Sequence, residues 1–176
     1  MTRTTTQWQA ADAAHFLHHT HLLPGLEAAV RGHAHDFAAL QRLRGRKFIL
    51  TNAPLAYAER VIGALGIGPL FDGVLSIEDM CMFGQLRPKP DVRMLRRVAV
   101  RLGVPPSRCV LVEDTLDHQK SARRIGMTTV WMQRWTRQAA KHVTPNAKVG
   151  VYLHRKPAYV CARISSLQQL HKRRLP

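Results

Sequence analysis

The chain has 176 residues, which suits one domain of ordinary size, and its hydrophobic content of 45% is sufficient for a core and argues against disorder throughout. Lys and Arg number 27 against 11 Asp and Glu, so the formal net charge of +16 attracts polyanions even without a specific site. No apolar stretch is long enough to span a bilayer and no leader-like apolar region follows Met1, so we expect a cytoplasmic protein.

The first part of the chain reads as helical. Residues 10–20 hold Phe16 and Leu17 in a helix-like setting, and Pro24-Gly25 breaks that pattern. A second helix is predicted from about His35, because the apolar residues after it recur at helical spacing: Phe37, Leu40 and Leu43.

The pattern then changes to strands that alternate with helices. A short apolar run at residues 47–50 ends in Thr51-Asn52 and predicts a buried parallel strand. A helix is expected over residues 55–65, ended by Gly66, and a second strand over residues 73–77.

The next segments repeat this order. Residues 87–90 form a rigid, proline-rich loop, and Asp91 is placed to cap a helix that Gly103 ends. A third strand at residues 109–112 leads directly into Glu113-Asp114-Thr115. The helix after it is expected to reach Arg124 and to end at Gly126.

A fourth strand is predicted at residues 128–132, with a loop-rich segment from 134 to 156 and a final short element at 159–164 that packs back on the core. We therefore predict an α/β fold whose sheet has at least four parallel strands, ending near Thr51, Ile77, Glu113 and Met132.

In open parallel sheets, ligands bind at the carboxyl ends of the strands. Three places in this sequence put polar side chains in the segments that follow predicted strands. Thr51 and Asn52 offer a hydroxyl and an amide, Lys89 an ammonium, and Glu113 and Asp114 two carboxylates. This set suits a metal-bound phosphate. Taken singly, each has a simpler interpretation: a helix cap at Thr51-Asn52, a solvated lysine, and a carboxylate pair at a helix start.

The order and spacing of these groups resemble the haloacid dehalogenase-like superfamily. FILTN at residues 48–52, RPKPD at 87–91 and VLVEDT at 110–115 are similar to its second, third and fourth motifs. ARRIGM at 122–127 with TVW at 129–131 resembles the helix and strand that come after the fourth motif in that superfamily. FDGV at 71–74, IED at 77–79, PAYV at 157–160 and ARI at 162–164 are similar to the pyrimidine 5'-nucleotidase branch. The resemblance covers about residues 12–170.

The resemblance implies a Rossmann-like parallel sheet with flanking helices and a Mg²⁺-dependent phosphatase whose aspartate nucleophile forms an aspartyl-phosphate that water hydrolyses. By resemblance, Thr51 and Asn52 bind phosphate, Lys89 offsets charge on phosphate and nucleophile, and Asp114 holds Mg²⁺ with Glu113 beside it. The superfamily often has Asp or Asn four residues after Asp114, where this chain has His118, so His118 is a doubtful metal ligand.

The family's first motif, Asp-x-Asp in an apolar strand, has no counterpart in this sequence. By resemblance, residues 1–44 are a remnant of a helical cap, and residues 45–176 are the core without its first strand. That strand is expected to be central, between those ending at Thr51 and at Asp114, and its absence to leave unpaired edges. We expect either a misassigned start codon or a truncated remnant.

Other clusters favour structural interpretations. Cys81, Cys109 and Cys161 contain no CxxC pair, which disfavours a disulfide framework or zinc site. Four histidines (His15, His18, His19 and His21) crowd one segment without acidic or cysteine partners, so metal binding is disfavoured there. Trp131 and Trp135 are expected to pack at the core and its rim. The basic run at residues 171–174 is expected to be dispensable for the fold.

The sequence leaves two functions open. The first is a Mg²⁺-dependent phosphate monoester hydrolase for a nucleotide or another small phosphorylated metabolite, inactive in this form because the nucleophile is missing. The alternative is a non-catalytic basic protein that binds polyanions or nucleic acid, since the charge is high, although the scatter of single arginines favours solvated faces. No membrane partner is expected.

Overall fold

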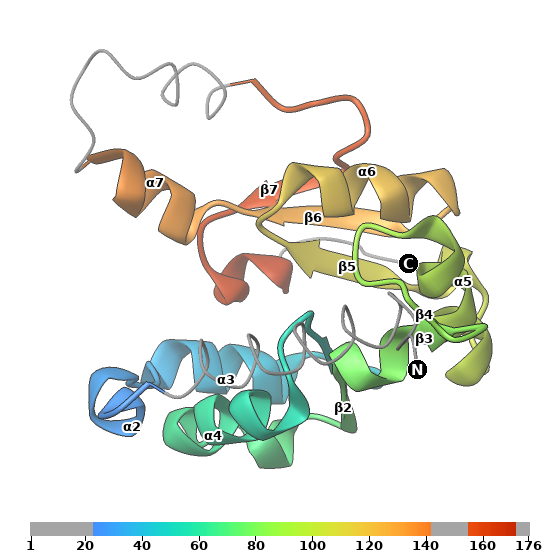
Figure 1. Ribbon diagram of the computed structural model, residues 1–176. Helices are drawn as coiled ribbons and strands as arrows, with labels where there is room; N and C mark the ends of the chain where they lie inside the picture. The colour runs from blue at the N-terminus through green and yellow to red at the C-terminus, as the bar shows by residue number, and fades with distance from the viewer. Residues whose placement is uncertain (1–22, 142–154, 172–176) are drawn as a thin grey trace, which may run out of the picture. The chain divides into compact units, whose positions relative to one another are not determined.

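A computed structural model describes residues 23–141 and 155–171 (Figure 1). The described residues up to Phe37, together with Arg44–Leu86, form one compact unit. Ala38–Leu43 and the described residues from Arg87 onward form a second. Across both units the architecture is α/β with parallel strands and flanking helices, as predicted. Within the described ranges no helix combines the length and the apolar character needed to cross a bilayer.

The first unit contains a parallel strand pair. β1 (Phe48–Leu50) pairs with β2 (Gly73–Leu75) in the register Phe48↔Gly73, and the Thr51 N–H donates to Leu75 O at 2.9 Å to extend the ladder. The connecting helix α4 (Leu55–Leu65) has the predicted bounds and ends at Gly66, whose φ of 66° is accessible to glycine without a steric penalty. The local signals in this segment therefore predicted both elements.

The second predicted strand is shorter than expected. It stops at Leu75 because Ser76 begins the 3₁₀ turn η2 (Ile77–Met80), in which the Ser76 and Asp79 side chains form a reciprocal capping box. Another 3₁₀ turn, η1 (Gly68–Leu70), lies between α4 and β2. The capping box of η2 therefore ends β2 two residues earlier than the apolar run predicted.

Short helices and a hairpin complete this part of the chain. Arg60 of α4 binds Glu27 of α2 (Leu26–Ala29), with Nε and Oε1 2.7 Å apart. The hairpin β3 (Cys81–Met82) and β4 (Gln85–Leu86) turns at Phe83-Gly84, where both residues have positive φ and Phe83 is 96% exposed. α3 (Ala34–Arg42), which confirms the helix predicted from about His35, buries Ala39 and Leu40.

The second unit is built on a three-stranded parallel sheet. β5 (Val110–Glu113), β6 (Thr128–Met132) and β7 (Ala162–Ile164) pair in that order, so the final segment packs back on the core as predicted. α6 (Leu116–Arg124) packs on β5 and β6, and α5 (Val92–Arg101) packs against α6 (Figure 1). The core contains Val130, Ala162, Ile164 and Leu170, the last from η4 (Leu167–Leu170).

The prediction of a loop-rich segment from 134 to 156 is wrong at its start. Residues 134–141 form α7 (Arg134–Lys141), and residues 142–154 lie outside the described ranges. The composition explains the helix, since Arg, Gln, Ala and Lys all favour helix although they produce little apolar periodicity. Trp131 is 2% exposed and Trp135 55% exposed, which confirms core packing for the first and rim placement for the second.

The described residues contain five parallel strands, which reaches the predicted number of at least four, but their hydrogen bonds divide them into a two-stranded and a three-stranded sheet, so the prediction that one sheet contains them is wrong. Among the described residues, β1 pairs along one edge only, with β2, and β5 along one edge only, with β6. The predicted cap boundary at residue 44 and the predicted absence of a central strand stay predictions. The predicted helix at 10–20 and the four clustered histidines lie outside the described residues.

Candidate active site

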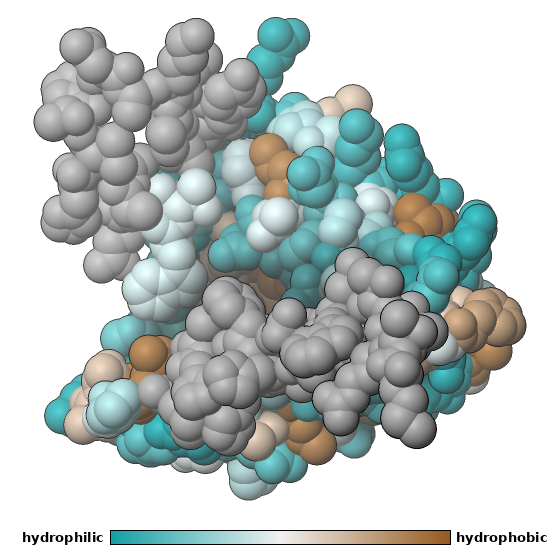
Figure 2. Space-filling model, viewed as in Figure 1, coloured by the Kyte–Doolittle hydropathy of each residue, from teal (hydrophilic) through white to brown (hydrophobic). Residues whose placement is uncertain are grey.

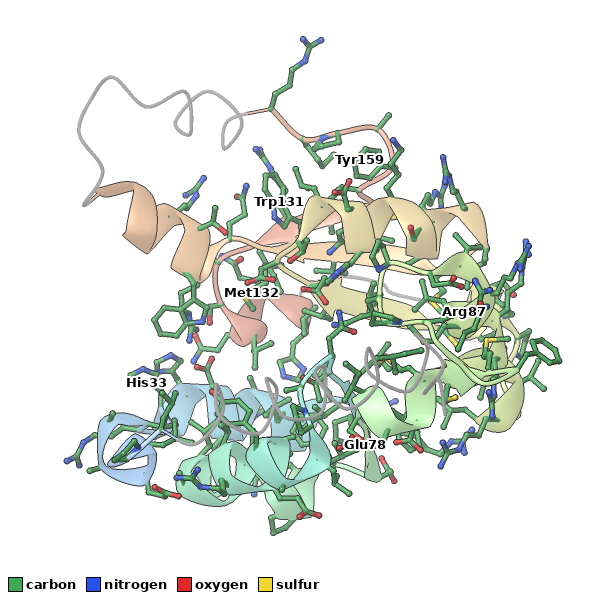
Figure 3. The ribbon with its side chains drawn as sticks, viewed as in Figure 1. His33, Glu78, Arg87, Trp131, Met132 and Tyr159 are labelled. Atoms are coloured by element: carbon green, nitrogen blue, oxygen red, sulfur yellow. The ribbon has the colours of Figure 1, made fainter. Side chains whose placement is uncertain are left out.

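Lys89 and Glu113 form a largely buried ion pair at the carboxyl end of β5. Lys89 Nζ lies 2.6 Å from Glu113 Oε2, and the two side chains are 9% and 11% exposed. The loop that carries Lys89 runs from Arg87 (labelled in Figure 3) into α5. Asp91 holds this junction, because its carboxylate accepts hydrogen bonds from the N–H groups of Arg93 and Met94, at 2.7 and 2.9 Å, and from Arg87.

Glu113 receives further donors around its carboxylate. Its Oε1 accepts the N–H groups of Asp114 and Thr115 at 3.1 and 3.3 Å, while His118 Nδ1 lies 3.2 Å from Oε2. Burial raises the pKa of Glu113, but hydrogen bonding with Asp114 and the adjacent Lys89 ammonium outweigh it and lower the pKa to about 2. Glu113 is therefore ionised at neutral pH.

Asp114 comes immediately after and is exposed to solvent. Its Oδ1 accepts the Thr115 hydroxyl at 3.2 Å. The neighbouring Glu113 carboxylate, helped by partial burial, raises the pKa of Asp114. Two consecutive carboxylates thus differ in role: Glu113 is a largely buried anion held by the Lys89 ammonium and two main-chain N–H groups, and Asp114 is the solvent-facing group.

Two buried side chains, Gln119 and Trp131, hold the Glu113-Asp114 loop through its main-chain carbonyls. The sequence did not single out either of them as a site residue. Gln119 Nε2 donates to Glu113 O at 2.7 Å and to Val130 O at 2.8 Å, so it links the end of β5 to the middle of β6. Trp131 Nε1 donates to Asp114 O at 2.9 Å, and its ring packs with Tyr159, labelled beside it in Figure 3. No sequence motif marks either role, because both depend on side chains that reach main-chain carbonyls across the sheet.

Thr51 and Asn52 lie at the end of β1, in the first unit. Thr51 Oγ1 accepts the Ala53 N–H at 3.0 Å, which closes a turn before α4. The helix itself is capped by another residue: both carboxylate oxygens of Glu78 lie 3.1–3.2 Å from Leu55 N. The simpler interpretation of Thr51-Asn52 as the direct cap of α4 is therefore wrong for Thr51.

Lys89, Glu113, Asp114 and His118 thus come together in the second unit, whereas Thr51 and Asn52 belong to the first. The prediction that Thr51, Lys89 and Asp114 face one cleft stays a prediction.

The donor set fits a divalent cation only in part. Among the described residues, no group of three or more His, Cys, Asp or Glu side chains is placed to hold a metal ion. Glu113 is already engaged with Lys89 and His118, so Asp114 is the carboxylate with a solvent-facing position. Mg²⁺ prefers several oxygen ligands. These residues therefore offer one ligand of such a site rather than a complete set.

Solved structures of similar fold come from several organisms. A conserved haloacid dehalogenase-like protein of unknown function from Agrobacterium tumefaciens has 22% identity and a TM-score of 0.62, covering 97% of this chain and 69% of its own. A HAD phosphatase from Thermococcus onnurineus has 24% identity and a TM-score of 0.55, over 78% of this chain and 54% of its own. An L-2-haloacid dehalogenase from Xanthobacter autotrophicus, with chloropropionic acid covalently bound, has 19% identity and a TM-score of 0.58, over 79% and 58%.

These likenesses show the fold, and the chain spans little more than half the length of the latter two proteins. No curated protein matches the chain. The family itself is shown by sequence: the haloacid dehalogenase-like hydrolase model matches residues 4–126, and a second, HAD-hydrolase-like model matches residues 86–167. The first match includes Thr51, Lys89 and Asp114 and spans more than half of the chain, which therefore belongs to the haloacid dehalogenase-like hydrolases.

Proposed function

We propose that this chain carries the phosphate-binding and metal-binding half of a Mg²⁺-dependent phosphate monoester hydrolase. The observation that supports it most is the Lys89 ammonium, fixed 2.6 Å from Glu113 beside the solvent-facing carboxylate of Asp114. A fixed cation and a solvent-facing carboxylate at the end of a parallel strand suit a phosphate group and its counter-cation.

Each residue has a distinct task in this proposal. Glu113 orients Lys89, so the ammonium meets phosphate oxygens without losing side-chain freedom on binding. Asp114 is one ligand of Mg²⁺, with Glu113 next to it, and His118 contributes through Glu113 rather than through the metal. Thr51 and Asn52 bind the phosphate at the end of β1. Mg²⁺, when bound, supplies charge stabilisation at the phosphoryl oxygens.

The proposed substrate is a nucleotide, of the pyrimidine 5'-nucleotide kind, or another small phosphorylated metabolite. Support comes from the sequence phrases shared with that branch, such as FDGV at residues 71–74 and PAYV at 157–160. The HAD phosphatase from Thermococcus onnurineus, which has a similar fold, supports the reaction class but not the substrate.

The 176-residue chain by itself is proposed not to turn over phosphate esters. The sequence contains no Asp-x-Asp, so the covalent step of the family's reaction has no nucleophile here. Catalytic residues that act as a unit are strongly non-additive: removing one of them abolishes most of the rate. The binding and positioning groups that this chain retains are therefore expected to supply only a small fraction of the activity.

The test compares this chain with a version preceded by an apolar strand that bears Asp-x-Asp. Both are assayed with Mg²⁺ on p-nitrophenyl phosphate and on pyrimidine nucleotides. We expect turnover only from the longer protein, abolished by Asp114→Ala and retained by the control Asp117→Ala, which removes an exposed carboxylate of α6. Comparable turnover by the shorter chain, lost in Asp114→Ala, would show that another carboxylate is the nucleophile.

A further inference from the structure

The net positive charge of this protein is confined to one part of the sequence. Residues 1–86 contain 7 Lys and Arg and 7 Asp and Glu, whereas residues 87–176 contain 20 and 4. The whole formal excess of +16 therefore belongs to the second part. A general compositional bias toward arginine would affect both parts alike, so this asymmetry points to a local cause.

On α5 the basic residues share one face of the helix. Arg93, Arg96, Arg97 and Arg101 are all exposed, and separations of three or four residues along the helix place them on one contiguous arc. The opposite face is apolar and buried, with Met94, Leu95 and Ala99 each 1% exposed. The arginines are therefore presented outward by a helix whose other side is anchored in the core.

The neighbouring helix repeats this arrangement. Lys120, Arg123 and Arg124 of α6 are exposed, and Gln119 and Ala122 on its other side are fully buried. Because α5 packs against α6, we take the two arcs together as the α5–α6 basic face, which consists of the four arginines of α5 and these three residues. Figure 2 shows mostly hydrophilic residues over the region of these helices.

Few acidic residues belong to these two helices or to the residue that caps α5. Asp91 is engaged with Arg87 and with the first N–H groups of α5, which leaves Asp117 as the exposed carboxylate within α5 and α6. The candidate active site uses Lys89, which lies outside the face and is buried against Glu113. The face is therefore a cationic surface that the proposed reaction does not require.

We propose that the α5–α6 basic face binds the phosphate backbone of a nucleic acid. Six of its seven cations are arginines, whose planar guanidinium groups match phosphate oxygens in a bidentate way. Along α5 they recur about once per turn, or about every 5.4 Å, which matches a repeating polyanion better than a single ligand. A membrane surface fits this face less well. Helices that bind a membrane surface insert their apolar face into it, whereas the apolar faces of α5 and α6 are buried in the core.

The test uses the full chain, a fluorescein-labelled duplex DNA of mixed sequence and fluorescence anisotropy over about 50 to 200 mM salt. The face variant is Arg96→Glu with Arg124→Glu. The matched control is Arg31→Glu with Arg44→Glu, which reverses two arginines of the neutral part and changes the net charge equally. A second face variant, Arg96→Gln with Arg124→Gln, removes the charges without reversing them, and circular dichroism checks that each protein is folded.

We expect the face variant to bind at least about tenfold more weakly and its slope of log K against log salt to fall by about 2, one for each phosphate that it no longer neutralises. The glutamine variant should fall between it and the unchanged chain, and the control should stay close to the unchanged chain. Equal weakening in the control would overturn the proposal, because net charge alone would explain binding. Phosphatidylserine vesicles form a second arm: binding to them that depends on Arg96 and Arg124, with DNA binding unaffected, would also overturn it.

Discussion

Lys89 Nζ and Glu113 Oε2 lie 2.6 Å apart although 24 residues separate them in the sequence. The pair joins the loop before α5 to the end of β5, and both side chains are largely buried. Removing one member of such a pair leaves the other charge without its partner in a poorly hydrated site, which costs more than the pair contributes net. The ion pair therefore links two segments of the fold, and it also orients Lys89, the group proposed to bind phosphate.

The first prediction is that Glu113→Gln destabilises the fold by about 1–3 kcal/mol at neutral pH, because it leaves the Lys89 ammonium without its carboxylate. Urea unfolding monitored by circular dichroism measures the loss. Glu59→Gln, which changes an exposed glutamate of α4, is the control and should change the free energy of unfolding little. Equal stability of Glu113→Gln and the unchanged chain would contradict the structural role of the pair.

The pH dependence of the same comparison has a defined sign. The pKa of Glu113 falls from 4.5 to about 2 on folding, so the folded state binds its proton more weakly than the unfolded state. Its stabilising contribution is present above about pH 4.5 and disappears as the pH falls toward about 2. We expect the difference in unfolding free energy between Glu113→Gln and the unchanged chain to shrink over that window. A difference that stays constant from neutral pH to acid would contradict the assignment.

Asp114 is predicted to behave in the opposite way. Its pKa is raised next to Glu113, so its ionisation at neutral pH slightly opposes folding. Because the group is exposed, screening keeps the effect small, and Asp114→Asn should be neutral or stabilising by up to about 0.5 kcal/mol at neutral pH. The same substitution in the longer, Asp-x-Asp-bearing protein should abolish Mg²⁺-dependent turnover. A stability loss of the size expected for Glu113→Gln would show that Asp114 is structural.

Trp131 should stabilise the site through its indole N–H as well as through packing. Trp131→Phe keeps an aromatic ring but leaves Asp114 O without its donor, so we expect a loss of about 1–3 kcal/mol in thermal or urea unfolding. Trp135→Phe is a matched control, since Trp135 is more than half exposed, and it should cost less than about 0.5 kcal/mol. Equal effects of the two substitutions would refute the role of the N–H group.

The C-terminal basic run divides at His171. We expect deletion of residues 172–176 to leave the melting temperature nearly unchanged, as predicted for the run as a whole. His171 differs, because its Nε2 lies 2.8 Å from Ala39 O and joins the end of η4 to α3. His171→Ala is expected to cost about 0.5–1.5 kcal/mol. If the deletion destabilised the protein more than His171→Ala does, the prediction for the last residues would be wrong.

Much of the fold was predictable because its signals are local. Gly66 ends α4 and Asp91 caps α5 at the expected residues, and the apolar runs at β5 and β6 lie within one residue of their predicted bounds. A cap, a glycine with positive φ and an apolar run each act over a few neighbouring residues, so the sequence contains the whole signal. The three motifs likewise predicted the family.

The partners of the site residues depended on tertiary structure. Glu78 caps α4 from 23 residues away, Glu113 engages Lys89, and Gln119 and Trp131 hold the Glu113-Asp114 loop through main-chain carbonyls. None of these contacts has a fixed spacing, and a main-chain carbonyl looks the same at every position of a sequence. The sequence by itself therefore determined which groups lie at the ends of the strands, and only tertiary packing, of the loop before α5 against β5, of α6 on β5 and β6, and of η2 against the start of α4, decided which groups bind one another.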